Sequence, residues 1–531
     1  MAYNDAMGRL TWHDLAYLTP ELTLLIAAIV LALLDLVLPS KVSRMYIGWL
    51  ALAGLLTSLG FVISFMLEAG GSSLSGVGSA EAGPLIRLLG DSYRIDGYAN
   101  LLKVVMLSAA SLIVLMSLGT VRNDSEIPDK GELYTLLLPA VLGAMIMASS
   151  GDLITIFVGM ELLGLSTYVL VGMRKNNGPG TGAEAGFKYV VIGGISSAFI
   201  LFGMSYLYGV TGSTNLGLIG MRLPEAIAQY NSLVYVGIFF LLGGLAIKIA
   251  AAPFHAWAPD VYQGASIPVA AFLAVVSKAA ALAVLFRIFY NTVLRDTEVF
   301  TGQGASLGTD AFLALKVLAA AAMIVGTTAA LRQHNIKRLL ALSGVANAGY
   351  LLVPIGIGVA GFHSSNMSEW LFYFIAYALM NIGAFAVLAV VGKAAGHEEM
   401  SGFAGLYYRA PWTAAGMLVL VLSLAGLPVT GGFFGKLFIL LGAAQMRDYW
   451  LVAIMLATTV ISYYFYFSII RQMFMRSAEG GSDIRIPAAT GLVIWICVAA
   501  TAVLGVTPGP VLEWINSNFN LSVDLFIGGF R

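Results

Sequence analysis

The chain has 531 residues, of which 59% are hydrophobic and only 11% are charged. An average soluble domain carries roughly 25% charged residues, so this composition excludes a soluble protein. The 28 basic and 28 acidic residues cancel, and no net charge is left to attract nucleic acid. The composition therefore predicts a polytopic membrane protein that does not bind nucleic acid.

Cysteine and histidine are too scarce for a metal or redox centre. Cys497 is the single cysteine, and the five histidines are far apart along the chain. An iron–sulfur cluster or a structural zinc ion needs several ligands. We expect no metal site and no cofactor on this chain. The first 19 residues lack a basic segment before the first apolar run, which predicts no cleaved signal peptide.

Apolar runs follow one another along almost the whole chain. A bilayer core about 30 Å thick needs roughly 20 apolar residues for each helical span. On that basis the sequence predicts an all-α protein with about fourteen transmembrane helices. The predicted spans are 20–38, 45–68, 96–119, 133–149, 153–172, 185–209, 232–263, 264–293, 311–330, 339–360, 369–392, 411–445, 449–470 and 486–508.

The distribution of lysine and arginine predicts the orientation. With the N-terminus outside, the inner loops hold 14 of these residues and the outer segments hold 7. Basic residues in short loops are retained on the cytoplasmic side. The bias therefore places both termini outside.

Two of the predicted spans are interrupted. The run 232–263 contains Pro253 and Pro259, and the run 411–445 contains Gly426 and Pro428. Because proline lacks an N–H donor, it leaves carbonyls that need other partners. We therefore expect two discontinuous helices.

Each predicted break falls in the fourth helix of a five-helix block, and the two blocks start from opposite sides of the membrane. This is the layout of an inverted repeat with a transport pathway near the broken helices. The predicted parts are helices 1–3 (1–132), the first repeat (133–293), the second repeat (311–470), and helix 14 with the tail (471–531).

Charged residues within the predicted spans are the candidate functional residues. Each charge at mid-membrane costs about 2.5 to 3.5 kcal/mol on insertion scales, so a cluster of them needs a reason. Glu161 is the only carboxylate deep in a span. The seven cations are Lys103, Lys188, Lys248, Lys278, Arg287, Lys316 and Lys436.

A desolvated lysine is suited to proton transfer, because burial disfavours the ammonium and a nearby carboxylate restores it. Function is the favoured interpretation for residues far from a span end or beside a break, namely Glu161, Lys248, Lys278 and Lys436. Snorkelling to the interface is favoured for Arg287 and Lys316.

The positions of three further residues do not decide between a functional and a structural interpretation. For Lys103, proton transfer and snorkelling to the interface are equally favoured. Lys188 opens its span, so its position alone favours an interfacial anchor. His255, between two prolines, is open between a structural imidazole and a relay group that titrates near neutral pH.

Several stretches together resemble a known family. They are DLITIFVGMELLGLSTYVLVG (152–172), EAGFKYVVIGGISSAFILFGMSYLYGVTGSTNL (184–216), KIAAAPFHAWAPDVYQGASIPVAAFLAVVSKAAALAVLFRIF (248–289) and NIKRLLALSGVANAGYLL (335–352). They are similar to the proton-translocating, antiporter-like subunits of complex I, the NADH:quinone oxidoreductase, and the similarity runs nearly end to end. It implies fourteen helices with two inverted five-helix repeats.

The resemblance also implies a role for each candidate. Glu161 corresponds to the helix-5 carboxylate, Lys248 to its helix-7 partner, Lys278 to the central lysine of helix 8, and Lys436 to the exit-side lysine of helix 12. Two more correspondences are Lys188, the helix-6 lysine used beside the Glu–Lys pair, and His255, the histidine between the two central lysines. Asn347 departs from the family, which usually has a histidine there. An amide cannot be protonated near neutral pH, which argues against a relay through that helix.

The expected function is therefore that of a membrane-arm subunit in a bacterial cell membrane, translocating protons through these residues. NADH, FMN, iron–sulfur clusters and quinone would be bound by partner subunits. The expected partners are other complex I subunits, chiefly the adjacent membrane-arm subunits, and the lipid bilayer. A subunit of a related cation/proton antiporter is the alternative, because the same lysines would serve it. A passive scaffold would not explain six intramembrane lysines.

Overall fold

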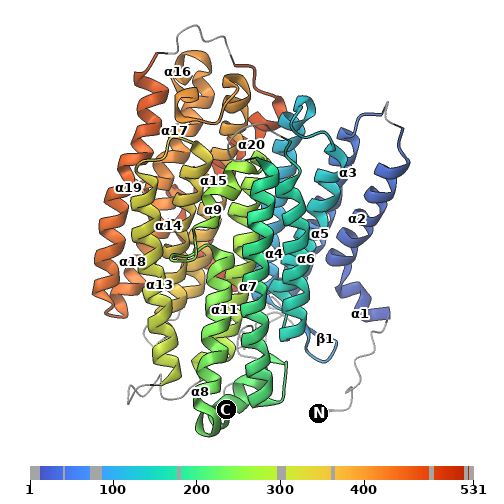
Figure 1. The fold of residues 1–531 in the computed structure, drawn as a ribbon, viewed down its shortest axis with the longest axis vertical. Coiled ribbons are helices and arrows are strands. Elements are labelled where there is room, and N and C mark those ends of the chain that lie inside the picture. The colour runs from blue at the N-terminus through green and yellow to red at the C-terminus, as the bar shows by residue number, and fades with distance from the viewer. Residues whose placement is uncertain are drawn as a thin grey trace.

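The fold is a bundle of long helices with very little β-structure (Figure 1). The structure, a computed structural model, describes residues 12–39, 42–71, 86–175, 181–295, 306–359, 365–477, 484–519 and 524. Within these residues, thirteen helices are long and apolar enough to cross a membrane. Two shorter apolar helices, α17 (Pro411–Ala425) and α18 (Gly431–Gln445), follow one another across a break and together correspond to the remaining predicted span. The prediction of an all-α polytopic membrane protein is confirmed.

The thirteen spans agree with the predicted boundaries to within a few residues, with one exception described below. They are α2 (Thr19–Val37), α3 (Met45–Gly71), α4 (Gly97–Thr120), α5 (Lys130–Ser149), α6 (Leu153–Gly172), α7 (Gly182–Thr211), α8 (Leu216–Ile249), the span of α10 and α11 (Ile267–Asn291), α13 (Leu307–Ala330), α14 (Ile336–Gly356), α15 (Asn366–Ala395), α19 (Tyr449–Met475) and α20 (Ala488–Val506).

Short elements connect the spans. The short helices are α1 (Trp12–Tyr17), α9 (Trp257–Gly264), α16 (Leu406–Arg409) and α21 (Pro508–Asn518), with single 3₁₀ turns at Val121–Asn123, Val293–Arg295 and Met400–Phe403. Strands β1 (Ile86–Leu88) and β2 (Tyr93–Ile95) form an antiparallel hairpin in which Ile86 is opposite Ile95. The hairpin lies at the lower end of the bundle in Figure 1, below α5 and α6.

Short polar side chains cap several helix starts. Asp96 accepts a hydrogen bond from the N–H of Ala99 at the start of α4. Thr181 and Thr430 cap α7 and α18 in the same way. Such caps satisfy backbone donors that have no partner inside the helix, a need that lipid makes more severe than water does.

Both predicted helix breaks are present. The first lies between the end of α8 at Ile249 and the start of α9 at Trp257, and the second between Ala425 and Gly431. Each first half ends at a residue with left-handed backbone, Ala250 with φ 60° and Gly426 with φ 83°. The backbone groups freed at each break must then find partners outside the helix.

The predicted start of the seventh span is wrong. Residues 210–231 were expected to form an outer segment, but α8 already begins at Leu216 and has a kink at Tyr230. Asn215 caps this start by accepting hydrogen bonds from the N–H groups of Gly217 and Leu218. The early part contains Arg222, Glu225 and Gln229, so it lacks the apolar run on which the span was predicted.

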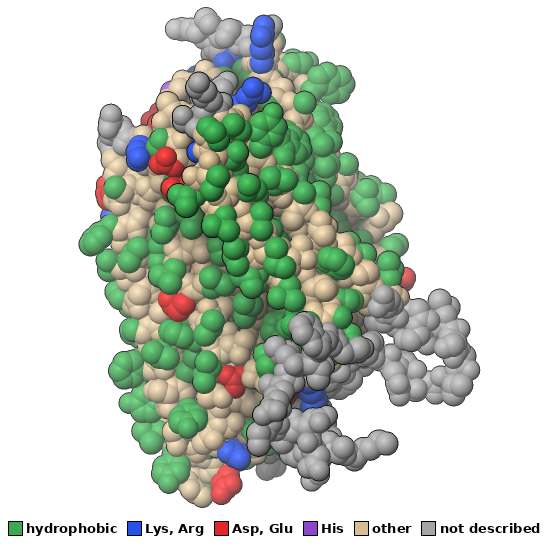
Figure 2. All heavy atoms as spheres, turned by 90° about the vertical axis from the view of Figure 1, so that its right-hand side faces the viewer, with side chains coloured by type: hydrophobic (Ala, Val, Ile, Leu, Met, Phe, Trp, Pro, Cys, Tyr) green, Lys and Arg blue, Asp and Glu red, His purple; other side chains and the backbone are tan. Residues whose placement is uncertain are grey.

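The centre of the bundle is formed by three spans that are almost enclosed by protein. In the most apolar window of α14, 100% of the residues are buried, against 94% for the α10–α11 span and 89% for α15. The corresponding values for α2, α7 and α19 are 22%, 33% and 33%, so these helices face outward. Figure 2 shows hydrophobic side chains over much of one such face.

Candidate functional site

Lys278 lies at the centre of the bundle, at the first position of α11 (Lys278–Asn291). It is 4% exposed, and its Nζ donates a hydrogen bond to the carbonyl oxygen of Gly344 in α14 at 2.6 Å. The Tyr377 hydroxyl is 3.5 Å away, and the ammonium lies 5.5 Å from the centre of that ring. Among the described residues Lys278 has no carboxylate partner within ion-pair distance. It is therefore a buried lysine held by neutral groups.

The backbone around Lys278 is specialised for this position. A π-helical turn at Leu273–Ser277 separates α10 (Ile267–Phe272) from α11 and ends directly before Lys278. Such turns are frequent at functional sites. On the opposite helix, a Cβ at Gly344 would come within 3.2 Å of the Lys278 Nζ, so the absence of a side chain there makes room for the ammonium.

Lys248 lies in the last turn of α8, directly before the first break. It lines a cavity of about 20 Å³ together with Tyr189, Trp257 and Ser277. Such a cavity is large enough for about one water molecule. Because Ser277 directly precedes Lys278, the cavity lies between Lys248 and the start of α11.

Glu161 lies in the middle of α6 and is partly buried. Its Oε1 accepts a hydrogen bond of 2.5 Å from the Ser197 hydroxyl of α7. Leu163, two residues after Glu161, and Ser196, next to Ser197, line the cavity that Lys248 lines, and among the described residues no ion pair joins Glu161 to Lys248. The structure thus brings the predicted Glu–Lys partners into the same region without contact.

Among the described residues, neither Lys188 nor His255 makes a hydrogen bond or ion pair with Glu161 or Lys248. Lys188 Nζ makes ion pairs with Glu184 at 2.7 Å and with Asp260 of α9 at 2.8 Å, and its side chain is 41% exposed. The structure therefore does not bring Lys188 to Glu161. His255 lies in the first break, and its buried Nδ1 has no hydrogen-bond partner among the described residues.

Lys436 lies in α18, just after the second break, and is 8% exposed. Its Nζ donates to the carbonyl oxygens of Leu424 at 2.9 Å and Ala425 at 3.3 Å, the last two residues of α17. The ammonium also lies 5.0 Å from the centre of the Tyr350 ring. Lys436 therefore caps the broken end of α17 and contacts an aromatic ring at the same time.

A row of hydroxyl and amide groups lies between Lys278 and Lys436. Ser343, next to Gly344, is 2.5 Å from the Tyr466 hydroxyl and accepts a hydrogen bond from Asn347 Nδ2 at 3.3 Å. The Tyr373 hydroxyl donates to Asn347 Oδ1 at 2.5 Å, and its ring packs edge-to-face on Tyr350. Hydroxyls both donate and accept hydrogen bonds, so these side chains form a polar region beside the Lys278 acceptor. The Tyr350 ring, which contacts Tyr373 and the Lys436 ammonium, links this region to Lys436.

Sequence reasoning missed this row, although it did single out Asn347. A signal was present, because Tyr373 and Tyr377 lie deep in an apolar run at the i, i+4 spacing that places side chains on one helix face. A buried tyrosine hydroxyl needs a partner, so two of them on one face indicate a polar lining.

A cluster of ion pairs at the end that the charge bias assigns to the cytoplasm was also missed. Lys337, counted as a loop residue, is 0% exposed and pairs with Glu398 at 2.7 Å. Arg174 pairs with Glu398 at 3.1 Å and with Glu126 at 2.6 Å. Burial lowers the pKa of Arg174, but these two carboxylates outweigh it and raise the pKa above its usual value.

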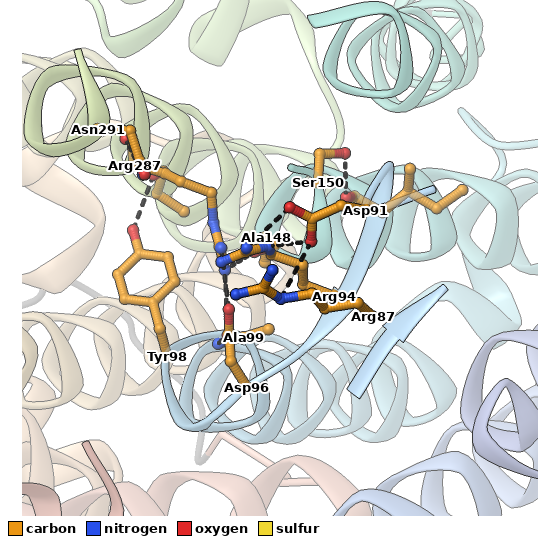
Figure 3. A network of polar contacts seen from close by, with 12 residues as sticks. Arg87, Asp91, Arg94, Asp96, Tyr98, Ala99, Ala148, Ser150, Arg287 and Asn291 are labelled. Carbon is orange, nitrogen blue, oxygen red and sulfur yellow. Dashed lines mark hydrogen bonds and ion pairs between the residues drawn. The ribbon is translucent and has the colours of Figure 1, made fainter. Parts of the chain in front are cut away.

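The snorkelling interpretation of Arg287 is wrong. Arg287 is 0% exposed, because two of its nitrogens contact the two Asp96 oxygens at 2.9 and 3.1 Å and one also donates to the Ala148 carbonyl (Figure 3). Lys316 does pair near a span end, with Asp448 at 2.8 Å. Lys103, left open from sequence, is buried and pairs with Glu21 at 2.8 Å. Among the described residues, these three cations have carboxylate partners, whereas Lys278 and Lys436 have none.

The described residues contain no group of three or more His, Cys, Asp or Glu side chains that could hold a metal ion. The candidate residues comprise one carboxylate, Glu161, and the amines of Lys248, Lys278 and Lys436, and the groups between Lys278 and Lys436 are hydroxyls and the Asn347 amide. Amines and carboxylates can bind and release protons.

The comparisons with known proteins agree with this chemistry. Residues 150–462 match the family model described as "NADH:quinone oxidoreductase/Mrp antiporter, TM". A relative from Paenibacillus sp. (strain JDR-2), named NADH-quinone oxidoreductase subunit N, is 61% identical over 98% of this chain and 99% of its own length.

Two solved structures share the fold over nearly the whole chain. One is a chain of respiratory complex I from Thermus thermophilus, with 31% identity, a TM-score of 0.74, and coverage of 93% of this chain and 98% of that one. The other is a chain of the membrane-bound sulfane sulfur reductase, an archaeal respiratory membrane complex, with 25% identity, a TM-score of 0.81, and coverage of 96% and 98%.

Proposed function

The chain belongs to the NADH:quinone oxidoreductase/Mrp antiporter transmembrane family, and from that premise we propose that one carboxylate, Glu161, and three lysines, Lys248, Lys278 and Lys436, carry protons across the membrane. It is an antiporter-like subunit of a proton-translocating NADH:quinone oxidoreductase in a bacterial cell membrane. The single observation that carries the assignment of residues is the central lysine, Lys278, which is buried and has no carboxylate partner in the part of the chain that the structure describes.

The proposed path has three segments. Glu161 acts on the ammonium of Lys248 through its negative charge, because a carboxylate favours the protonated form of a neighbouring lysine. When that influence weakens, the proton leaves Lys248 through the cavity that Ser277 also lines. Lys278 receives it at the entrance to the second half of the path.

From Lys278 the path continues along α14. The Gly344 carbonyl holds the Lys278 ammonium but cannot pass a proton on, so we assign the step from Lys278 to the adjacent Ser343 hydroxyl to water. Ser343 in turn contacts Tyr466 and Asn347. We assign the last transfer to Lys436, which lies over the Tyr350 ring. Asn347 takes part as a hydrogen-bonding group and does not titrate, so the hydroxyls and water carry the proton in this segment.

In this proposal, residues 133–293 and 311–470 form two inverted repeats, each with one broken helix, and Lys278 lies between the breaks. Lys188 and His255 serve the entrance half: Lys188 from its place beside Asp260, and His255 from the first break. NADH oxidation and quinone reduction take place in partner subunits, with adjacent membrane-arm subunits as the direct neighbours.

The Glu161→Gln variant tests the proposal, because the amide keeps the shape of the side chain but removes the charge that acts on Lys248. The measurement is NADH-driven proton uptake by inverted membrane vesicles that contain the complete enzyme, with the amount of this subunit checked. We expect lower uptake and lower coupled NADH:quinone activity. Normal uptake with normal assembly would contradict the role of Glu161.

A cation/proton antiporter without redox partners is the second candidate, because the matching family model includes Mrp antiporters. Purification of the native assembly separates the two functions. Peripheral iron–sulfur subunits in the preparation support the first, and a purely membrane-embedded assembly supports the second.

A further inference from the structure

The short helix α9, the second half of the first broken helix, is held by cations from two other parts of the chain. Asp260 Oδ1 contacts Arg338 Nη1 of α14 at 2.5 Å, and Asp260 Oδ2 contacts Lys188 Nζ of α7 at 2.8 Å. The same Arg338 nitrogen donates to the Gln263 side chain at 2.8 Å. One acidic residue of α9 thus joins helices from both proposed repeats.

The backbone at the end of α9 is held in addition. Lys337 Nζ donates to the Ala265 carbonyl at 2.8 Å, and Arg174 Nη1 donates to the Gln263 and Ala265 carbonyls at 3.3 and 3.4 Å. Cations are favourable at a helix C-terminus, where carbonyl groups lack partners inside the helix. This end of α9 is therefore fixed to α14 and to the loop after α6.

The other end of α9 touches the Lys248 cavity. Trp257, its first residue, lines that cavity and donates its indole N–H to the Ile247 carbonyl at 3.0 Å. The same indole stacks on Tyr189 at 5.1 Å between ring centres. An eight-residue helix is about 12 Å long, so a displacement of the Gln263 end of α9 also moves Trp257 at the Lys248 cavity.

The helix α14 carries both the arginine that contacts α9 and the carbonyl group that accepts the hydrogen bond from Lys278. Arg338 and Gly344 lie on it six residues apart, about 9 Å along the axis. The Gly344 carbonyl accepts the hydrogen bond from Lys278. Attachment of α9 to α14 therefore links the wall of the Lys248 cavity to the acceptor of Lys278.

We propose that Asp260 and Arg338 form a positioning pair that fixes α9 against α14 and thereby sets the distance between the Lys248 cavity and the Lys278 acceptor. The pair does not carry the proton. It keeps the Lys248 cavity and the Lys278 acceptor at a fixed separation. This inference rests on the proposed function of Glu161 and the three lysines.

The test compares Asp260→Asn, Arg338→Gln and the double variant in the complete enzyme. The measurement is the number of protons taken up by inverted vesicles per NADH oxidised, together with the amount of the subunit. We expect each single variant to lower this ratio at least twofold without loss of subunit. Both changes break the Asp260–Arg338 contact, although Asp260→Asn also weakens the Lys188 ion pair and Arg338→Gln also removes the Gln263 hydrogen bond. The combined loss in the double variant should therefore be smaller than the product of the two single losses. A wild-type ratio in the single variants, or losses that multiply in the double variant, would overturn the proposal.

The Arg338→Lys variant covers the case in which the neutral variants do not assemble. It keeps the positive charge but cannot contact Asp260 and Gln263 with one planar group. We expect an intermediate ratio. A wild-type ratio here, combined with missing subunit in the neutral variants, would mean that the pair serves folding alone and would also overturn the proposal.

Asp448→Asn is the matched control, because it breaks the Lys316–Asp448 ion pair of 2.8 Å, whose side chains are 20% and 15% exposed and which does not involve α9. It should leave the proton ratio unchanged, and an equal loss in the control would contradict a specific effect. Lys278→Met, measured in parallel, separates the two levels of inference. If that variant pumps normally, the proposed function fails; if only the Asp260 and Arg338 variants pump normally, the positioning pair alone fails.

Discussion

The two broken helices satisfy their exposed backbone groups with different side chains. At the first break the Trp257 indole donates to the Ile247 carbonyl, and Lys248 makes no hydrogen bond to another described residue. At the second break Lys436 itself donates to the Leu424 and Ala425 carbonyls. The position of a lysine beside a helix break therefore does not by itself show that the lysine carries protons. At the first break Trp257 caps the helix end and Lys248 is the proposed proton carrier. At the second break Lys436 has both roles.

Lys278, between the two breaks, should show the largest effect. We expect Lys278→Met to lower NADH-driven proton uptake at least about twofold without loss of subunit, because it removes a titratable group that transfers protons between the halves. Lys278→Arg should fail equally, since a guanidinium stays protonated. If the arginine variant takes up protons at the wild-type rate, Lys278 supplies only a fixed charge.

Lys436 is the residue at which capping and proton transfer can be separated. Lys436→Ala should impair proton uptake and, because it leaves buried carbonyls without a donor, destabilise the subunit by about 1–3 kcal/mol. Lys436→Arg keeps the donors but cannot release a proton, so it should restore stability and not uptake.

Lys436→Glu completes this comparison. A glutamate can titrate but donates nothing to the carbonyls when ionised, so under a carrier role it should retain more uptake than alanine. Uptake in the glutamate variant at or below that of alanine, together with recovery in the arginine variant, would identify Lys436 as a cap. Thermal stability and uptake should be measured in the same membrane preparation.

Tyr373→Phe should have a smaller effect on the connection between the breaks. It leaves the buried Asn347 Oδ1 without its 2.5 Å donor, which costs about 1–3 kcal/mol of stability for an unsatisfied buried acceptor. We expect a partial loss of proton uptake. Tyr407→Phe, at a tyrosine that is 47% exposed, is the matched control and should leave uptake unchanged.

Trp257→Phe should have the smallest effect. Phenylalanine can still stack on Tyr189, so the main loss is one hydrogen bond to the Ile247 carbonyl, about 0.5–1.5 kcal/mol in stability. Proton uptake should remain close to wild type. A loss as large as that of Lys278→Met would mean that the cap at the first break is as important to transport as the lysine between the breaks.

The sequence predicted what depends on neighbours along the chain. Hydropathy located the spans, and Pro253 and Gly426 marked the breaks, because both signals are local. Ion pairs between residues that are distant in sequence could not be predicted from such local signals. Arg287 and Asp96 are separated by 191 residues, so nothing in the sequence near Arg287 indicates that a carboxylate will reach it.

For the candidate site, the sequence likewise predicted the depth of residues within their spans but not the contacts between helices. The deep positions of Glu161, Lys278 and Lys436 followed from their distances to the span ends. In the structure Glu161 lies inside α6, Lys278 inside the α10–α11 span and Lys436 inside α18. The placement of Lys188 beside Asp260 depends on how α9 packs, which no periodicity reveals. The hydroxyl row likewise depends on the contact of α14 with α15 and α19.

The complete enclosure of α14 has a consequence for the biogenesis of the protein. Of its packing partners, α9 and α13 are synthesised earlier, but α15 and α18 are synthesised later, as is α19, to which Ser343 and Tyr350 are hydrogen-bonded. Until those later helices are inserted, Ser343 and Asn347 lack the tyrosine hydroxyls that contact them in the finished bundle. Lipid offers no substitute for these hydroxyls. The polar side chains of α14 therefore depend on the order of membrane insertion. They obtain their hydrogen-bond partners only after the ribosome has synthesised helices in the last third of the chain.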